Sequence, residues 1–333
     1  MNGFPSIRMR RLRRSATLRD MLAETDLSVD RLVAPLFVRC GDRIRTEIPS
    51  LPGQFQLSID TAMETVRRWA DAGLRGVLLF GIPQSKDAVG SSAWDDEGPV
   101  QRLTREIKRE RPEVLVITDT CLCEYTDHGH CGTPAELPDG RVDVDNDATL
   151  ESLAKAAVSQ ARAGADVVAP SAMMDGQVAA IRGALDEAGL KDTLILSYAV
   201  KFASSFYGPF RDAADSAPTH PKLSGRDTYQ MDPRACSQAI REARLDAIEG
   251  ADMLMVKPAA AYLDVIAEVR RELPLPLAAY HVSGEYAMLK AASANGWLDE
   301  RRAALEIARS IRRAGADVII TYYAEQLAAW LAE

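Results

Sequence analysis

The sequence lacks the features that mark membrane proteins, secreted proteins and dinucleotide-dependent enzymes. Among 333 residues, no apolar run approaches the roughly 18 to 20 residues needed to cross a membrane. The N-terminus carries arginines without the apolar stretch of a secretory signal, and no GxGxxG motif follows a predicted strand. A formal net charge of −8 argues against a general nucleic-acid binder. These absences predict a cytoplasmic protein whose partner is neither a membrane nor a nucleic acid.

Cysteine is scarce and unevenly distributed. Three of the five cysteines, Cys121, Cys123 and Cys131, lie in one loop just after an apolar run. Three thiols so close together suggest a zinc site, and three protein ligands leave a fourth position open, as in catalytic zinc sites. His128 or His130 could supply a fourth ligand and make the site structural, and the sequence leaves both alternatives open. The other two cysteines are expected to be small buried apolar residues: Cys40 and Cys236.

One pattern repeats along most of the chain: apolar runs of strand length alternate with amphipathic stretches of helix length. The eight predicted strands are 32–38, 76–81, 114–118, 166–170, 193–198, 253–256, 277–281 and 317–321. The predicted helices include 60–72, 148–163, 175–188, 233–249, 260–272 and 300–314.

Several predicted helices end in a glycine just before a strand, most clearly in three Gly-Ala-Asp sequences that begin at positions 164, 250 and 315. The strands are apolar on both faces, as expected for a buried parallel sheet. Eight such units predict an α/β fold, the (β/α)8 TIM barrel, over residues 31–333. A doubly wound open sheet is the structural alternative.

Two segments depart from the repeating pattern. Residues 1–30 contain the basic run RMRRLRR at 8–14, which could be a transit peptide, a nucleic-acid tail, an arm on a neighbouring subunit or simply a solvated stretch. The acidic residues between positions 20 and 30 argue against a transit peptide. Residues 202–230 show little sign of a regular element and follow a strand. We interpret them as a lid over the active site.

Two lysines are expected at the same end of adjacent strands. Lys257 directly follows a fully apolar run, and Lys201 follows the preceding strand. Burial and a second cation nearby both favour the neutral amine, which can attack a ketone and form a Schiff base. Either lysine alone could instead extend to solvent or pair with a carboxylate. Their common position favours a shared catalytic cavity.

Further polar residues follow strand ends, where barrel enzymes place their active groups. Asp119 lies beside the cysteine loop and is a candidate for proton transfer. Arg211 and Arg226, in the predicted lid, could hold a substrate carboxylate. Ser283 and Tyr322 could donate hydrogen bonds to a carboxylate or ketone oxygen.

Together these motifs resemble the porphobilinogen synthase family, also called 5-aminolevulinate dehydratase. The resemblance covers nearly the whole chain and is carried by the motifs DTCLCEYTDHGHCG (119–132), APSAMMDGQV (169–178), KFASSFYGPFR (201–211), LMVKPA (254–259), YHVSGEYAM (280–288) and GADVIITYYA (315–324). It implies the condensation of two 5-aminolevulinate molecules to porphobilinogen with loss of two waters, an early step of tetrapyrrole synthesis.

The resemblance also implies roles for individual residues. Lys257 and Lys201 would form Schiff bases with the two substrate molecules, and the three cysteines would hold the catalytic zinc of the zinc-dependent branch. Glu242 would bind an allosteric magnesium, and residues 1–30 would contact a neighbouring subunit of a homo-octamer. The remaining residues would contact substrate carboxylates: Arg211, Arg226, Ser283 and Tyr322.

Two other functions fit parts of the sequence. A barrel aldolase with a single Schiff base would use Lys257 but leave Lys201 and the cysteine loop without a role. A non-enzymatic scaffold stabilised by zinc would use the cysteines alone. The presence of two strand-end lysines together with three clustered cysteines favours the synthase.

Overall fold

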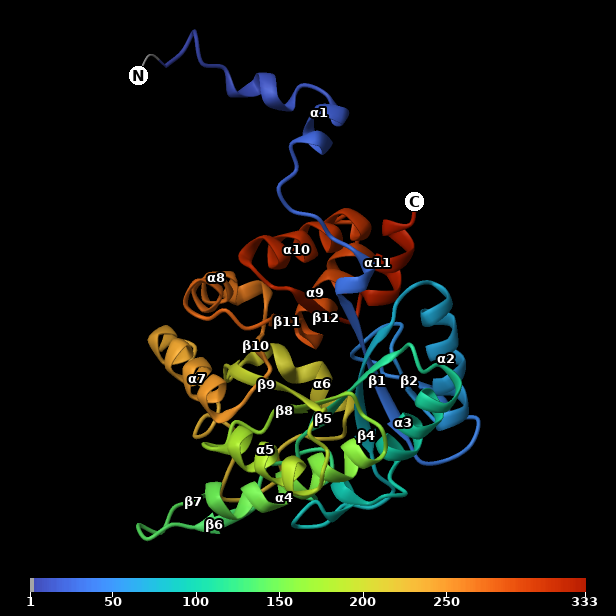
Figure 1. The fold of residues 1–333 in the computed structure, drawn as a ribbon, viewed down its shortest axis with the longest axis vertical. Helices are drawn as coiled ribbons and strands as arrows, with labels where there is room; N and C mark the ends of the chain where they lie inside the picture. Colours follow the sequence, from blue (N-terminus) through green and yellow to red (C-terminus); the bar gives the residue numbers. More distant parts are fainter. Residues whose placement is uncertain (1–2) are drawn as a thin grey trace.

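The computed structural model describes residues 3–333 and contains a closed barrel of eight parallel strands surrounded by helices (Figure 1). The eight strands pair in chain order, and the last pairs with the first, so the barrel has no open edge. They are β1 (Leu32–Arg39), β4 (Gly76–Ile82), β5 (Leu115–Thr120), β8 (Val167–Pro170), β9 (Leu194–Lys201), β10 (Met253–Lys257), β11 (Leu277–His281) and β12 (Val318–Thr321). The predicted TIM barrel is therefore confirmed, and the open sheet is wrong.

The barrel strands are apolar because both of their faces are buried. All seven residues of β4 are buried, and so are seven of the eight residues in β9. Side chains on one face fill the barrel interior, and those on the other pack against the surrounding helices. A continuous apolar run therefore marks each strand in the sequence.

The three Gly-Ala-Asp sequences join the end of a helix to the start of a strand. Their glycines have φ values of +104° to +123°, a region that side chains larger than hydrogen rarely adopt. Each aspartate then accepts a hydrogen bond from a backbone N–H of the preceding barrel strand: Asp166 from Val116 at 2.8 Å, Asp252 from Ile195 at 2.8 Å and Asp317 from Leu277 at 3.1 Å. The repeat therefore sets the strand register at the N-terminal end of the barrel.

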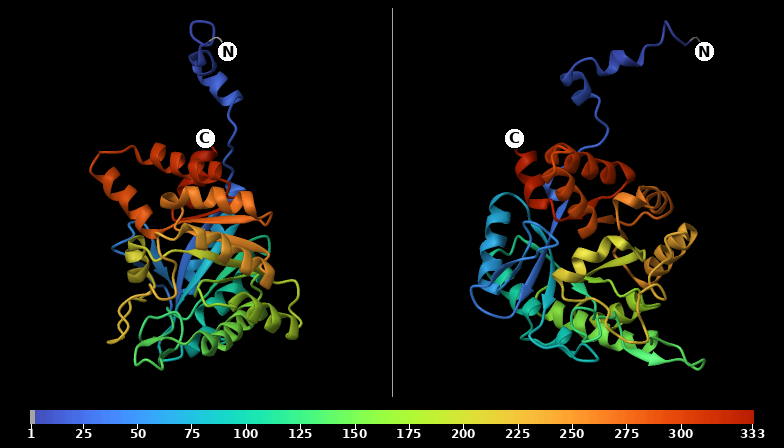
Figure 2. Two further views of the ribbon diagram at one scale, coloured as in Figure 1. Left: turned by 90° about the vertical axis from the view of Figure 1, so that its left-hand side faces the viewer. Right: turned by 180° about the vertical axis from the view of Figure 1, so that it is seen from behind.

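Helices cover the outside of the barrel (Figures 1 and 2). The six helices expected from the sequence are present as α2 (Ile59–Asp71), α4 (Asn146–Arg162), α5 (Gln177–Glu187), α7 (Cys236–Glu249), α8 (Leu263–Glu272) and α10 (Glu300–Ala314). The structure adds α3 (Pro99–Glu110), α9 (Ser283–Ala294) and α11 (Ala324–Leu331). None of the helices described is both long and apolar enough to span a bilayer.

Short strands and 3-10 helices lie outside the eight barrel strands. Strands β2 (Arg45–Glu47) and β3 (Phe55–Leu57) form an antiparallel pair joined to β1, and β6 (Pro134–Glu136) and β7 (Val142–Val144) form a separate hairpin. Short 3-10 helices occur at Val29–Arg31 (η2), Ser91–Trp94 (η3) and Ala260–Tyr262 (η5). Cys40 and Cys236 are half-buried rather than buried as expected, and Cys236 packs against the core.

Segment 202–230 is more regular than expected. It begins with the 3-10 helix η4 (Ser205–Tyr207), which runs directly into α6 (Gly208–Ala213). Pro209 lies in the first turn of α6, where its missing N–H costs no helical hydrogen bond, so this proline is compatible with the start of a helix. The segment is attached at the C-terminal end of the barrel, because the Phe202 N–H donates to the Lys257 carbonyl and the Thr219 N–H to the His128 carbonyl, both at 3.0 Å.

The N-terminal residues extend away from the barrel (Figures 1 and 2). They form the 3-10 helix η1 (Met9–Arg13) and the short helix α1 (Ala16–Met21), neither of which contains a buried residue. Several large apolar side chains of this arm are more than half exposed: Phe4, Ile7, Met9, Leu12 and Met21.

Candidate active site

The two predicted lysines lie side by side at the C-terminal end of the barrel. Lys201 is the last residue of β9 and Lys257 the last of β10, and the two are direct partners in the strand register. Only 4% of Lys201 and 5% of Lys257 is exposed. Both amines also lie near the ring of Tyr198, so the two buried lysines share one environment at this end of the barrel.

Lys257 lies in an aromatic pocket. Its Nζ atom is 4.5 Å from the ring centre of Tyr280 and 5.1 to 5.2 Å from those of Tyr198, Tyr207 and Phe210. Burial, followed by the positive charge of Lys201, lowers the pKa of Lys257 to about 7. The lowered pKa favours the neutral amine of Lys257, and a neutral amine is a nucleophile.

Asp119 connects this pocket to the cysteine loop. Its Oδ2 atom accepts a hydrogen bond from the Ser171 hydroxyl at 3.0 Å, and the Ser171 carbonyl accepts one from the Lys201 amine. Burial raises the pKa of Asp119, although the charges of Lys201 and Lys257 offset part of this effect. The Oδ1 atom is buried and has no hydrogen-bond partner within the described chain.

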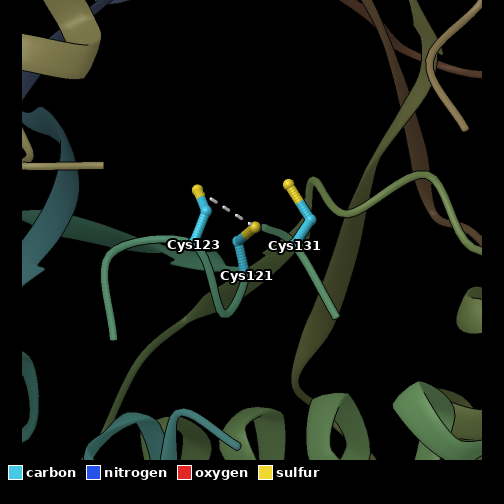
Figure 3. Close-up of side chains that lie close together, drawn as sticks. All are labelled: Cys121, Cys123 and Cys131. Carbon is cyan, nitrogen blue, oxygen red and sulfur yellow. Dashed lines mark hydrogen bonds between the residues drawn. The ribbon is translucent and has the colours of Figure 1, made fainter. Parts of the chain in front are cut away.

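The three cysteines converge in space as well as in sequence. Cys121, Cys123 and Cys131 are at most 2% exposed, and their sulfur atoms lie within 4.8 Å of one another (Figure 3). The Sγ atoms of Cys121 and Cys123 are 3.5 Å apart. An oxygen of Glu124 lies 3.4 Å from the Cys123 sulfur, and burial raises the pKa of Glu124 to about 7.

The cysteine cluster fits a zinc ion. Burial raises the pKa of the Cys121 thiol well above its ordinary value, whereas hydrogen bonds from Cys121 and Cys123 lower that of Cys131. Burial disfavours three thiolates so close together unless a cation lies among them, and sulfur is a preferred zinc ligand. The cluster also borders the lysine pocket, since the charge of Cys123 acts on Lys257.

The two histidines of the cysteine loop face other partners. The Nε2 atom of His128 is 3.1 Å from the Ala88 carbonyl, and its Nδ1 atom accepts from the His130 backbone at 3.1 Å. The ring nitrogens of His130 contact the Tyr229 hydroxyl at 3.1 Å and the Leu223 carbonyl at 2.9 Å. Both histidines therefore anchor the cysteine loop to neighbouring segments, and the other possible metal ligands beside the thiols are carboxylates, since oxygen atoms of Asp119 and Glu124 lie within 4.8 Å of the Cys121 sulfur.

Two arginines of segment 202–230 lie near each other and near the thiols. Arg226 is 5% exposed and donates to the carbonyls of Gly129 and Ser216, both at 2.8 Å. Burial, followed by the charge of Arg226, lowers the pKa of Arg211. The Nε atoms of both arginines are buried without a partner in the described chain. Two guanidinium groups with unused donors suit an anion such as a carboxylate.

Ser283 and Tyr322 also lie near the lysine pocket. The Ser283 hydroxyl accepts from the Phe210 backbone N–H at 3.0 Å and donates to the Phe206 carbonyl at 3.2 Å. The Tyr322 hydroxyl accepts from that of Tyr280 at 3.2 Å. Because the rings of Phe210 and Tyr280 both lie beside the Lys257 amine, each of these two hydroxyls bonds to a direct neighbour of Lys257.

Glu242 lies elsewhere, on the outer side of the barrel. It lines a cavity of about 390 Å³ between α5 and α7, together with three other acidic residues: Asp175, Asp246 and Glu249. Burial, and then the charge of Asp175, raise the pKa of Glu242. Burial raises that of Asp246 to about 7. The structure therefore separates Glu242 from the lysines and cysteines.

Comparison with known proteins now identifies the family. The family model described as "Delta-aminolevulinic acid dehydratase" matches residues 6–330. The chain belongs to this family. It is 53% identical to the delta-aminolevulinic acid dehydratase of Halalkalibacterium halodurans over 326 residues, which cover 98% of this chain and 97% of the relative. The protein of the same name from Synechococcus elongatus is 53% identical over 329 residues, 99% of this chain and 100% of the relative.

A solved structure of this family supports the same fold. The delta-aminolevulinic acid dehydratase of Toxoplasma gondii, crystallised with the reaction product porphobilinogen, superimposes with a TM-score of 0.93. The two chains are 44% identical, and the match covers 97% of this chain and 91% of the other.

Sequence reasoning missed Tyr198, whose ring lies near both lysine amines, 5.1 Å from that of Lys257 and 5.5 Å from that of Lys201. Strict alternation in a strand puts residues three apart on opposite faces. The pairing of β9 with β10 shifts by one residue between Ser197 and Val200, which is a β-bulge. The bulge brings Tyr198 and Lys201 to the same side, and nothing in the sequence marks it.

The lowered pKa of Lys257 predicts an unusual pH dependence of its reactivity. Reductive methylation with formaldehyde, quantified by mass spectrometry, should label Lys257 relative to the exposed Lys191 most strongly at about pH 7 to 8. The ratio should fall toward about pH 10, because ordinary lysines lose their protons there. A ratio that stays constant over this range would contradict the depressed pKa.

Proposed function

We propose that this protein joins two molecules of 5-aminolevulinate through Schiff bases on Lys201 and Lys257 and releases porphobilinogen and two waters. The activity follows from family membership: the protein is a porphobilinogen synthase, a hydro-lyase of haem and tetrapyrrole biosynthesis. The single observation that carries the residue assignment is the pair of buried lysines at partnered positions of β9 and β10.

The lysines supply the covalent chemistry in this proposal. The neutral amine of each lysine attacks the ketone of one substrate molecule, and loss of water gives an imine that withdraws electrons from the neighbouring carbon. Both substrates are then held in one cavity, where effective molarities can reach about 10⁵ M or more. Asp119, with one oxygen free of protein partners, takes or returns protons at the substrate atoms beside Lys201.

The substrate carboxylates would be held by the groups at the cavity mouth. The unused Nε donors of Arg211 and Arg226 suit one carboxylate, and the hydroxyls of Ser283 and Tyr322 suit the other. Ser283 would have to give up its hydrogen bond to the Phe206 carbonyl to donate to a substrate. Substrate binding and the placement of segment 202–230 are coupled in this way.

The zinc ion would be held by Cys121, Cys123 and Cys131, whose chemistry fits it. When bound, it supplies a Lewis acid with an open coordination position next to the lysine pocket. The magnesium ion would bind at Glu242, in the acidic cavity between α5 and α7, and act from outside the active site.

The lysine roles predict a specific pattern of activity loss. Lys257→Met and Lys201→Met should each reduce porphobilinogen formation by about 10³-fold or more, because a covalent step is lost. Lys191→Met, at an exposed lysine outside the cavity, is the matched control and should behave as the unsubstituted protein. Activity is measured as pyrrole formation from 5-aminolevulinate with zinc present. Normal activity of Lys201→Met would favour an aldolase-like mechanism with one Schiff base.

Two variants separate the two metal ions. Cys123→Ser should lose bound zinc while keeping its response to added magnesium in any residual activity. Glu242→Gln should keep its zinc and lose the response to magnesium. Metal content by mass spectrometry and a magnesium titration of activity give both results. Unfolding of the chain on zinc removal would instead point to a structural zinc.

Segment 202–230 is proposed as the active-site lid. It carries Arg211 and Arg226, and its backbone bonds to Ser283, to His128 of the cysteine loop and to Lys257. Substrate bound to both arginines should hold it closed. Limited proteolysis within 202–230 should therefore slow when 5-aminolevulinate is added. Equal cleavage with and without substrate would contradict the closure.

Residues 1–30 are proposed as an arm that binds a neighbouring subunit within a homo-octamer. Apolar side chains that are exposed on one chain would be buried in such a contact. Leu12→Gln should therefore shift sedimentation toward smaller assemblies. Leu115→Gln is a control of similar exposure on the barrel, 43% compared with 51%, and should not. Unchanged sedimentation of Leu12→Gln would count against the arm.

A further inference from the structure

Glu285 is a buried carboxylate to which the proposed reaction gives no role. It is the third residue of α9 and is 3% exposed. Its hydrogen-bond partners are backbone N–H groups, which favour its ionised form. Burial nevertheless raises its pKa to about 7. Burial of a carboxylate with no cation among its hydrogen-bond partners is costly, which indicates that Glu285 has a role of its own.

The carboxylate joins two strand ends. Its Oε2 atom accepts from the Val282 N–H at 2.8 Å, at the start of α9 after β11. Its Oε1 atom accepts from the Ala260 N–H at 2.8 Å and the Ala261 N–H at 3.3 Å. These alanines belong to η5, which begins three residues after Lys257. Glu285 therefore ties the backbone that follows Lys257 to the backbone that precedes Ser283.

The same turn of α9 also touches segment 202–230. Ser283 bonds to Phe206 and Phe210 of that segment. A Cβ atom at Gly284 would lie 2.6 Å from the Phe206 carbonyl oxygen and 2.7 Å from its Cα atom, so only glycine fits there. Phe210 in turn contacts the Lys257 amine, with 5.2 Å between Nζ and the ring centre. These contacts lead from Lys257 through Phe210 to the first turn of α9, and through Glu285 back to the loop that follows Lys257.

We propose that Glu285 is a positioning residue for Lys257: its carboxylate fixes the loop after β10 against the first turn of α9, and so holds the Lys257 amine in register with Ser283 and segment 202–230. This inference rests on the proposed function, because it assigns Glu285 to the Schiff base at Lys257. Lys201 is held differently, through the Ser171 carbonyl and the backbone of Met231. Loss of the Glu285 contacts should therefore affect the two lysines unequally.

These three hydrogen bonds need both carboxylate oxygens of Glu285 as acceptors. Three N–H donors point at the two carboxylate oxygens, and an ionised carboxylate accepts all three. In Glu285→Gln, one oxygen becomes an NH₂ group that cannot accept, so a donor faces a donor and at least one contact breaks. The matched control is Glu306→Gln, at an exposed glutamate on α10.

The test is to trap both Schiff bases and compare them. The full-length zinc-loaded protein is mixed with 5-aminolevulinate and quenched with borohydride at increasing times, and mass spectrometry measures the adducts at positions 201 and 257 separately. Glu285→Gln should slow the adduct at Lys257 by about 10- to 100-fold, as expected for a displaced reacting group. Its adduct at Lys201 should form at the rate of the unsubstituted protein. Glu306→Gln should change neither rate.

Each other outcome overturns a defined claim. Equal slowing at both lysines would make Glu285 a general structural residue, and no slowing would remove it from the site. Absence of both adducts in the unsubstituted protein would instead overturn the proposed function. If Glu285→Gln does not fold by circular dichroism, Glu285→Asp keeps the charge, shortens the reach and is judged by the same ratio.

Discussion

The proposed chemistry depends on the burial of two amines at partnered positions of neighbouring strands. A lysine whose pKa lies near 7 rather than 10.5 reflects a folded state that disfavours its charge by roughly 5 kcal/mol at acid pH. This penalty is fully present below about pH 7 and disappears as the pH rises toward the pKa of an unfolded lysine. The barrel tolerates it because the rest of the core is large and because a closed sheet holds the two strand ends rigidly together.

Groups of both charge signs surround the two lysines. Asp119 faces the amines, and the thiol cluster lies beyond it, close enough to act electrostatically on Lys257. The two arginines come from segment 202–230 and stay adjacent because Arg226 is fixed by two backbone carbonyls. The site is therefore built from two parts. The barrel supplies the lysines and Asp119, and segment 202–230 supplies the two arginines.

Much of this arrangement is readable in the sequence. The eight strands are predictable because strands buried on both faces form continuous apolar runs, and the helix ends are marked by glycines that take positive φ. The lysines and cysteines are predictable because such residues rarely follow an apolar strand unless they take part in catalysis or bind a metal. The start of α6 is hard to predict because its second residue is a proline, and the start of α9 because its second residue is a glycine.

Other features depend on three-dimensional contacts that no local pattern records. The bulge that turns Tyr198 toward Lys201 is a mismatch between two strands. The Ala88 and Leu223 carbonyls that His128 and His130 contact lie far away in the chain, as do the N–H groups of Ala260 and Ala261 that Glu285 accepts from. These contacts arise only when the barrel closes, and they decide how the reactive groups are held.

The most direct test of the central claim is a crystal structure of the protein reduced with borohydride in the presence of 5-aminolevulinate. Two buried amines in one cavity predict two covalent links in a single subunit, one to the Nζ atom of Lys201 and one to that of Lys257. A structure with substrate linked to only one of these lysines, or with the two links in separate cavities, would contradict the claim.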